Sequence, residues 1–448
     1  MPMSVTITDV KIPLRARLVE GAISIQDGRI SKISKTALAP KTETRIDGGG
    51  LIALPGLIDV HVHLRDMELA YKEDFSTGTL AAAAGGFTTV LDMPNTKPPT
   101  SSAERLREKS DRARSMIHVN VGFYASLPET SAEQLEMVKA GAIAFKLYMN
   151  DPAPSGWHHD RARLLASLIG TRPLGVPVAC HAELGSQIAR LQLRYQGPGK
   201  NSFRNFLRAH SPRYEAEAIR TITSAALRTR SRIHVCHLTT EQALRGIVAA
   251  RRAGVRVTCE TTPQHLLLDE KDLARKKGLA LTVPPLRTAR DAGWLWKSVV
   301  NGQIDAVASD HAPHTLEEKT KENVWEIKPG IPGLETTLPL LLTKQYRSEV
   351  TLGRIIEVLA SGPARIFGLR RKGQLAIGMD ADLTLVDPKE RFRIDSSKFY
   401  SKARFSPFDG VECVGRPVLT MVAGRVVYDH GEIVEMRQGK IMTHEAGS

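Results

Sequence analysis

Apolar residues between Leu57 and Ser309 fall into eight short runs with helical patterns between them. The runs cover residues 57–62, 87–91, 117–123, 143–148, 176–180, 232–236, 255–260 and 304–309. They are almost continuously apolar, as in FTTVLDM and RIHVCHL, which is typical of parallel strands covered on both faces. Eight strands alternating with helices predict an α/β fold of the TIM-barrel type, (β/α)8, rather than an open doubly wound sheet.

Two of the segments between these strands carry helix start signals. Ser101 is followed three residues later by Glu104, and Ser131 is followed three residues later by Gln134. This is the spacing of a capping box, and Gly141 follows the second segment as a stop signal. We expect helices to begin at these two serines.

The two ends of the chain show a different pattern. Residues 1–54 and 373–435 contain short alternating segments with Asp-Gly and His-Gly turns, as in PVLTMVAGRVVYDHGEIV. Such turns between β-branched runs are hairpin signals. We expect residues 1–54 and 373–448 to form one small β-sandwich domain beside a catalytic barrel of residues 55–372.

The composition is that of an ordinary globular protein. Hydrophobic residues make up 42% of the 448 residues, and no run approaches the roughly 20 apolar residues that a membrane span needs. The N-terminal segment lacks the apolar core of a signal peptide. The four cysteines form no C-x-x-C pair, so we expect free thiols. These observations predict a cytoplasmic protein without membrane contact.

The formal net charge of +14 is the one unusual bulk property. Basic residues are dispersed, with short clusters such as Arg370-Arg371-Lys372, and no nucleic-acid recognition motif accompanies them. A solvated basic surface is therefore favoured over a nucleic-acid site. The same charge would assist the encounter with a small anionic substrate.

Histidines recur at the carboxyl ends of the predicted strands, where the active sites of such barrels form. His61 and His63 are two residues apart in one strand, so both imidazoles can approach one ion. His181 and His237 follow the fifth and sixth strands in the same way. A pair alone is equally well explained by structural histidines, but four at strand ends predict a metal centre.

Lys146 lies in the fourth strand, in AFKLYM, where an ordinary buried lysine is the simplest interpretation. An alternative is reaction of its neutral amine with carbon dioxide, which gives a carbamate whose two oxygens can bridge metal ions about 3.5–4 Å apart. Burial and nearby cations would favour the neutral amine by lowering its pKa from roughly 10.4. We hypothesise this carbamate and two divalent metal ions.

Asp310 follows the eighth strand, in SDHAPH. An aspartate before a histidine in a loop is often only a cap, but a carboxylate at this strand end can ligate a metal and accept a proton during hydrolysis. Zinc is the expected metal, although the same ligands accept cobalt or manganese.

Several motifs resemble the amidohydrolase superfamily and, within it, the dihydroorotases. The matching segments are HVHLR (61–65), DMPNT (92–96), FKLYM (145–149), CHAE (180–183), SDHAPH (309–314), PGIPGLETTLPLL (329–341) and the tail GQLAIGMDADLTLVD. They cover nearly the whole chain. The bridging lysine is similar to that of the dihydroorotases that use a carboxylated lysine.

The resemblance implies a role for each matched residue. The implied metal ligands are His61, His63 and Asp310 for one ion, His181 and His237 for the other, and Lys146 with a hydroxide between them. The implied substrate contacts are Arg65, Asn95, His314, Pro329, Gly330 and Gly333. Arg65 suits a substrate carboxylate because guanidinium groups bind carboxylates with two hydrogen bonds.

The implied reaction is the reversible cyclisation of N-carbamoyl-L-aspartate to L-dihydroorotate in de novo pyrimidine (UMP) biosynthesis. In the hydrolytic direction the hydroxide attacks the ring amide carbonyl, and the catalytic residue Asp310 passes the proton to the leaving nitrogen. The partner is then a small anionic pyrimidine precursor. A homo-oligomer, or contact with another enzyme of the pathway, stays open.

Three segments depart from the usual pattern of these relatives. Asp66-Met67-Glu68 follows HVHLR in place of Glu-Pro-Gly, Val283 replaces the asparagine of Asn-Pro-Pro-Leu-Arg, and Gln264 stands where an aromatic residue or histidine is frequent. We expect these changes to affect substrate recognition rather than metal binding.

Two alternative functions remain. A hydantoinase, dihydropyrimidinase or allantoinase acts on rings that need no carboxylate grip, so Arg65 is the residue that discriminates against this class. A non-catalytic scaffold protein would typically have lost ligands, whereas this chain keeps every one.

Overall fold

The computed structural model describes residues 4–14, 17–36, 44–151, 160–434 and 437–444. Eight parallel strands form its core, and each pairs with the next along the chain. They are β6 (Leu57–Val62), β7 (Phe87–Asp92), β8 (Asn120–Ser126), β9 (Ala142–Tyr148), β10 (Val178–His181), β11 (Ile233–Val235), β12 (Val257–Thr261) and β13 (Ala306–Val307). A bridge between Val62 and His311 joins the last strand region to the first. The TIM-barrel prediction is confirmed.

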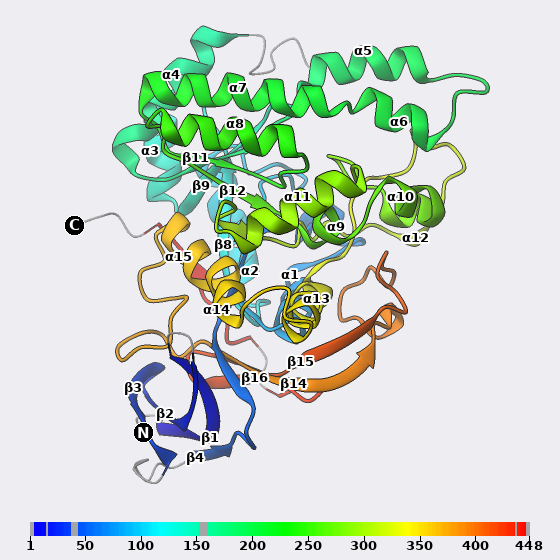
Figure 1. Cartoon of the computed structure of the whole chain (residues 1–448). Coiled ribbons are helices and arrows are strands. Elements are labelled where there is room, and N and C mark those ends of the chain that lie inside the picture. The colour runs from blue at the N-terminus through cyan, green and yellow to red at the C-terminus, as the bar shows by residue number, and fades with distance from the viewer. Residues whose placement is uncertain (1–3, 15–16, 37–43, 152–159, 435–436, 445–448) are drawn as a thin grey trace.

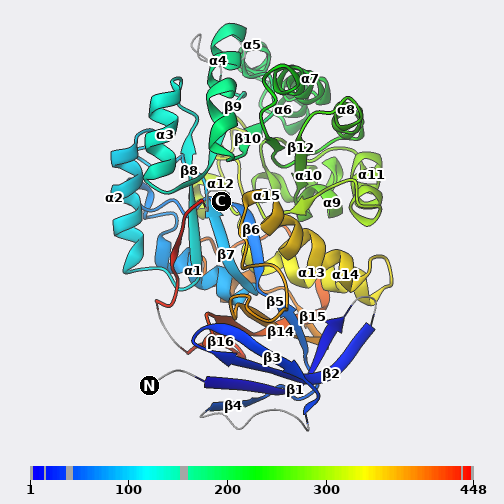
Figure 2. The same cartoon turned by 90° about the vertical axis from the view of Figure 1, so that its left-hand side faces the viewer.

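Helices surround the barrel on its outside (Figures 1 and 2). The helices between consecutive strands include α1 (Phe75–Ala84), α2 (Ala103–Arg114), α3 (Ser131–Lys139), α4 (Arg161–Thr171), α5 (Gly185–Tyr195), α6 (Phe203–Ala209), α7 (Pro212–Thr229), α8 (Glu241–Arg252), α9 (Pro263–Leu267), α10 (Glu270–Lys276) and α11 (Ala289–Val300). After β13 come α12 (Leu316–Lys319), α13 (Leu334–Tyr346), α14 (Leu352–Ile356) and α15 (Gly362–Phe367).

Both predicted helix starts differ by one residue from the observed caps. The hydroxyl of Ser102 accepts from the backbone N–H of Arg105 and caps α2. Thr130 and Glu133 form a reciprocal capping box at α3. In each case a hydroxyl residue stands next to the predicted serine, and the extended backbone of Ser102 and Thr130 decides which of the two caps. Gly141 follows α3 with φ +105°, as a stop residue should.

Both chain ends contribute to a second sheet, which is mostly antiparallel. Its strands lie in the order β17 (Glu432–Ile433), β16 (Arg425–Asp429), β15 (Glu412–Val422), β14 (Leu383–Arg393), β5 (Ile52–Pro55), β1 (Ser4–Leu14), β2 (Arg17–Gln26) and β3 (Arg29–Ser34), with β4 (Thr44–Asp47) beside β1. The antiparallel pairing of β14 with β5 joins the two ends. Strands β14–β16 lie between the barrel and β1–β4 (Figure 2).

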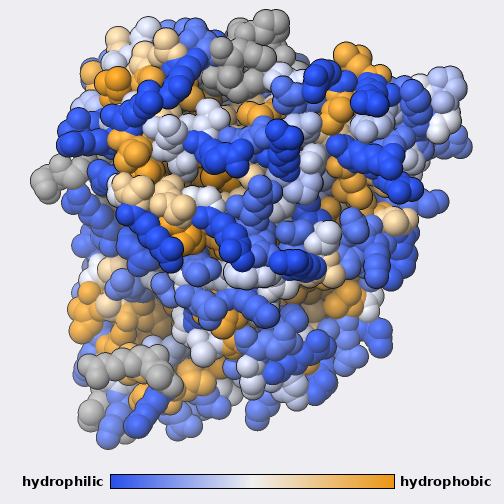
Figure 3. All heavy atoms as spheres, turned by 45° about the horizontal axis from the view of Figure 1, so that its top comes forward, coloured by the Kyte–Doolittle hydropathy of each residue, from blue (hydrophilic) through white to orange (hydrophobic). Residues whose placement is uncertain are grey.

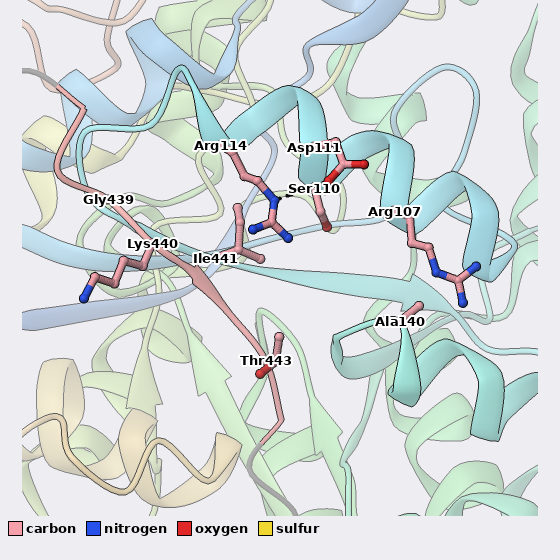
Figure 4. A pocket seen from close by; sticks show the side chains of 9 residues that line it. All are labelled: Arg107, Ser110, Asp111, Arg114, Ala140, Gly439, Lys440, Ile441 and Thr443. Carbon is pink, nitrogen blue, oxygen red and sulfur yellow. Dashed lines mark hydrogen bonds and ion pairs between the residues drawn. The ribbon is translucent and has the colours of Figure 1, made fainter.

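After this sheet the chain returns to the barrel. Strand β18 (Ile441–Met442) pairs with Val121 and Gly122 at the start of β8. A cavity of about 730 Å³ lies between this tail and α2, with Arg107, Arg114 and Lys440 in its wall (Figure 4). The tail and this cavity therefore lie toward the amino-terminal end of the strands, away from the predicted site.

Apolar side chains fill the interior of the barrel. Tyr124 and Phe367 pack edge to face with ring centroids 5.8 Å apart, and the Tyr124 hydroxyl donates to the carbonyl of Val60. This packing leaves the carboxyl-terminal end of the strands for polar groups. On the outer face in Figure 3, charged and polar side chains surround scattered apolar ones. Among the described residues, no helix is long and apolar enough to cross a membrane.

Candidate metal and substrate site

Five of the predicted ligands converge at the carboxyl ends of the strands. The Nε2 atoms of His61 and His63 lie 3.4 and 3.3 Å from Oδ1 of Asp310. The ring centroid of His237 lies 5.2 Å from that of His61 and 4.4 Å from that of His181. All five side chains are buried, and we call them the histidine cluster.

The backbone turns sharply at two members of this cluster. His237, just after β11, has φ +34°, and Asp310, just after β13, has φ +48°. These are left-handed conformations that side chains other than glycine seldom adopt, and such strain concentrates at functional sites. The surrounding structure must therefore hold these two residues in this conformation.

Glu260, a buried carboxylate on β12, supports the cluster from behind. Its Oε1 lies 2.5 Å from Nδ1 of His61, and its Oε2 lies 3.0 Å from Nε2 of His234. Burial alone would raise the pKa of Glu260, but His61 and His234 hold it below the usual range. Glu260 was not among the predicted site residues, although an acidic residue inside the strand VTCET was a signal.

Glu183 supports His181 in the same manner. Its Oε2 lies 2.8 Å from Nε2 of His181, while its Oε1 lies 3.3 Å from Nδ1 of His210. Glu183 is fully buried. A metal-binding histidine typically gives its second ring nitrogen to a carboxylate or carbonyl oxygen, which fixes the ring and its tautomer. Glu183 lies within the quoted CHAE motif, but sequence reasoning gave it no role.

The ring nitrogens of the cluster fit a metal centre. Glu260 holds Nδ1 of His61, and the Asn95 side-chain oxygen holds Nδ1 of His63 at 2.7 Å, so the Nε2 atom of each ring faces Asp310. Nδ1 of His237 is buried and has no hydrogen-bond partner among the described residues. A buried lone pair without a partner is costly, and a bound cation would satisfy it. The ligand atoms of His61, His63 and Asp310 lie within 4.8 Å of one another.

Lys146 lies in β9, with its Nζ 3.1 Å from the Cys236 sulfur. Burial lowers the pKa of Lys146, but Cys236 and Tyr148 raise it, and the net effect is a pKa above the ordinary value of 10.5. The expectation of a lowered pKa is therefore wrong for the protein residues alone, because sequence reasoning missed the neighbouring thiol. Divalent cations act in the opposite direction, since positive charge favours the neutral amine.

Asp310 is a carboxylate at neutral pH. Burial would raise its pKa, but the positive charge of His61 and the neighbouring ring of His63 hold it below 3.8. A charged carboxylate among histidines can both ligate a cation and receive a proton.

A second group of polar side chains lies beside the histidine cluster, and we call it the arginine cluster: Arg65, Lys72, His314 and Glu318. The Arg65 guanidinium donates to the Pro313 carbonyl at 3.2 Å, and its Nη2 lies 3.1 Å from Nε2 of His314. Arg65 has φ +59° and its side chain is buried. Burial and the positive charge of Arg65 lower the pKa of His63 to about 4, although the contact of His63 with Asp310 acts in the opposite direction.

The segment from Pro329 to Gly333 packs tightly on SDHAPH. The Pro329 carbonyl lies 3.0 Å from Nε2 of His314, and the backbone N–H of Gly333 donates to Nδ1 of His311 at 3.2 Å. Gly330 has φ +134°, and a Cβ there would lie 2.5 Å from the Ala312 carbonyl oxygen. Glycine is required for this close approach.

Asn95 contacts the histidine cluster. Its side-chain oxygen accepts from His63, so in this structure it holds a candidate metal ligand, and the implied contact of Asn95 with the substrate carboxylate stays a prediction. Asn95 is exposed. The loop after β7 is short enough that the asparagine reaches the first strand.

Two of the three departures from the usual motifs have structural roles. Asp66 is fully buried and accepts from the backbone N–H of Phe75 at the start of α1, and it also pairs with Arg112. Gln264 is buried and donates to the carbonyl of Ser309 at 3.2 Å. Val283 lies at the edge of a separate apolar cluster.

The fold and the residues at its strand ends agree with a family comparison. The amidohydrolase family matches residues 52–427. The chain belongs to the amidohydrolase family.

Relatives of this amidohydrolase cover most of its length. A dihydroorotase of Methanothermobacter thermautotrophicus is 38% identical over 92% of this chain and 92% of its own. A dihydroorotase of Bacillus cytotoxicus is 37% identical over 92% of this chain and 95% of its own. Among solved structures, an L-hydantoinase (dihydropyrimidinase) from Arthrobacter aurescens has a TM-score of 0.93 and 32% identity, covering 99% of this chain and 100% of its own.

Proposed function

We propose that this amidohydrolase is a dihydroorotase, which interconverts N-carbamoyl-L-aspartate and L-dihydroorotate in pyrimidine biosynthesis. The observation that carries the proposal is the arginine cluster beside the histidine cluster. A buried guanidinium next to a hydrolytic centre suits a cyclic amide that bears a carboxylate. The identity to curated dihydroorotases over 92% of the chain supports the same substrate.

We assign His61, His63, His181, His237 and Asp310 as ligands of two divalent metal ions, with zinc as the expected metal. Lys146, as a carbamate, would complete the set. The unsatisfied Nδ1 of His237 and the carboxylates behind His61 and His181 support this assignment. Bound there, the ions would supply activated water and polarise the amide carbonyl.

The protein residues would orient the substrate and move its proton. Arg65 and His314 would bind the ring carboxylate, with the backbone from Pro329 through Gly330 to Gly333 along the ring. Asp310 is the catalytic residue and would carry the proton between water and the ring nitrogen, because its carboxylate stays charged at neutral pH. Asn95 would contact the same carboxylate through its amide nitrogen while its oxygen holds His63.

The remaining features of the proposal follow from this substrate. The division into residues 55–372, for catalysis, and the two chain ends, as a supporting domain, stays a proposal. Four buried free thiols support a reducing, cytoplasmic setting. Self-association and contact with another enzyme of the pathway would be compatible with this substrate.

A hydantoinase is the second candidate. The TM-score of 0.93 to the Arthrobacter aurescens enzyme favours it on backbone grounds. However, the identity to that hydantoinase is 32%, against 38% to the archaeal dihydroorotase. Arg65 would also be left facing no substrate carboxylate.

The test is a substrate panel with metal-loaded protein. We expect kcat/KM for dihydroorotate to exceed that for hydantoin, dihydrouracil and allantoin by at least about a hundredfold. A ring without a carboxylate would leave the buried Arg65 guanidinium unpaired, and such sites discriminate strongly against these substrates. A preference for any of the other three rings would overturn the assignment. Protein treated with a chelator is the matched control, and its activity should return when metal is added back.

A further inference from the structure

His314 is the one imidazole of the arginine cluster, and donors and acceptors surround both of its nitrogens. Nδ1 lies 3.1 Å from the Lys72 ammonium and 3.2 Å from Oε2 of Glu318. Nε2 lies 3.1 Å from Nη2 of Arg65 and 3.0 Å from the Pro329 carbonyl oxygen. Each nitrogen therefore has one donor and one acceptor within reach.

These contacts allow two arrangements of a neutral ring. In the first, Nδ1–H donates to Glu318 and Nε2 accepts from Arg65. In the second, Nε2–H donates toward Pro329 and Nδ1 accepts from Lys72. Only one nitrogen of a neutral imidazole carries a proton, so the two arrangements exclude each other.

The charged ring is disfavoured at this position. Burial lowers the pKa of His314, and the positive charges of Arg65, Lys72 and Lys319 lower it further. Glu318 offers the opposing charge, but it is engaged by the Lys72 ammonium at 2.7 Å and by the backbone N–H of Thr315. The choice at neutral pH is therefore between the two neutral tautomers.

The two arrangements differ in what they present to an anion. In the first, the Nε2 lone pair occupies one Arg65 donor and would repel a carboxylate. In the second, Nε2–H is a donor that an anion can share with the Pro329 carbonyl, and the Arg65 Nη2 group is released. A carboxylate accepts hydrogen bonds only, so it can use both side chains only in the second arrangement.

We propose that Lys72 is a positioning residue, which holds His314 in the Nε2–H tautomer so that His314 and Arg65 together donate to the carboxylate of the substrate. The Lys72 side chain is buried, its ammonium reaches the ring edge opposite Arg65, and Glu318 anchors it there. This inference rests on the proposed function for the identity of the anion. The tautomer itself does not depend on that identity.

The first test is kinetic and compares Lys72→Met with Lys402→Met. Lys402 pairs with Asp74 and the Ala70 carbonyl in the same region and does not contact His314, so it is the matched control. Because Lys72→Met loses the charge-assisted hydrogen bond to His314, we expect its KM for dihydroorotate to rise about tenfold or more, with kcat nearly unchanged. Lys72→Arg keeps a cationic donor and should restore KM to within a few-fold of wild type.

The second test reads the tautomer directly, by 15N NMR of zinc-loaded full-length protein labelled on histidine. The His314 signals are assigned by their loss in His314→Asn. We expect Nε2 to carry the proton in wild type and Lys402→Met, and the proton to shift toward Nδ1 in Lys72→Met. A wild-type ring protonated at Nδ1, or the same tautomer in wild type and Lys72→Met, would overturn the proposal.

These readouts separate the two claims. Wild-type protein that does not turn over dihydroorotate would refute the proposed function, while the NMR comparison would still decide the role of Lys72. Wild-type protein that turns over dihydroorotate, with KM and tautomer unchanged in a folded Lys72→Met, would refute the role of Lys72 alone. Should Lys72→Met fail to fold, the His314 tautomer is read in Lys72→Arg. A ring protonated at Nε2, as in wild type, supports the proposal. A ring protonated at Nδ1 contradicts it.

Discussion

The histidine cluster and the arginine cluster are neighbours, but they are built from different parts of the fold. The histidines lie at strand ends, where Glu260 on β12 holds His61 and Glu183, two residues further along the chain, holds His181. The arginine cluster lies in the loops after β6 and β13, where Arg65, Asp66 and Met67 all have positive φ. Strand pairing fixes the first cluster, whereas loop-to-loop hydrogen bonds fix the second.

This difference separates the type of reaction from the choice of substrate. Barrel strands place metal ligands with little freedom, while loops at the same end can change independently. Asp66, Met67 and Glu68, which replace the usual Glu-Pro-Gly, lie in the loop after β6, next to Arg65, which would select the substrate. Changes in the histidine cluster should therefore abolish turnover of every ring, and changes in the arginine cluster should act on carboxylated rings.

The largest expected effect comes from Asp310→Asn. Loss of the carboxylate that moves the proton should lower kcat by roughly 10²–10⁴-fold for every substrate. The matched control is Asp305→Asn, at the amino end of the same strand, where the carboxylate pairs with Arg251. Steady-state assays on dihydroorotate check this. If Asp310→Asn keeps more than a tenth of the wild-type kcat, Asp310 is not the proton carrier.

Arg65→Met should instead act selectively. Removing the guanidinium should lower kcat/KM for dihydroorotate by roughly 10–100-fold, because a charge-assisted contact to the carboxylate is lost. Any slow turnover of dihydrouracil should stay within a few-fold of wild type. Arg105→Met, an exposed change on α2, is the control. Equal losses on both rings would mean that Arg65 supports the structure of the site rather than the choice of substrate.

The same division describes what the sequence revealed. His61, His63, His181, His237 and Asp310 were predictable because strand period and barrel geometry dictate where such residues point. Glu260 was not, since its contact with His61 joins residues far apart in the sequence. Glu183 lies only two residues from His181, but no local pattern shows that its carboxylate turns back to that ring. The contact of Asn95 with His63, and that of Cys236 with Lys146, depend on loop and side-chain packing that no local pattern encodes.

Glu260→Gln probes the support behind the histidines. Weakening this contact should lower metal affinity by roughly 10–100-fold, as is typical for groups that orient a ligand. Competition with a chromogenic chelator measures it. Glu335→Gln is a suitable control, because Glu335 is a partly buried carboxylate that contacts the backbone of Tyr400 and Ser401 instead of a histidine. Unchanged metal affinity in Glu260→Gln would show that Glu260 does not support metal binding.

The smallest effect is on stability and concerns Glu335 alone. Burial raises the pKa of Glu335 to about 8 from 4.5. The folded state then holds the proton more tightly than the unfolded state, so this stabilisation is complete below pH 4.5 and is lost as pH rises through about 8. Glu335→Gln, which cannot ionise, should lose less stability between pH 5 and 9, by on the order of 1–2 kcal/mol. Denaturant unfolding at several pH values measures this. If the explanation fails, the free energies of unfolding of wild type and Glu335→Gln will change with pH in parallel.

The most direct test of the two-cluster account is a crystal structure of zinc-loaded Asp310→Asn with bound dihydroorotate. The account predicts the ring carboxylate within hydrogen-bond distance of Arg65 and His314, with the ring amide directed at the histidine cluster. A ligand bound in the reverse orientation, with its carboxylate at the histidine cluster and its amide toward Arg65, would contradict it.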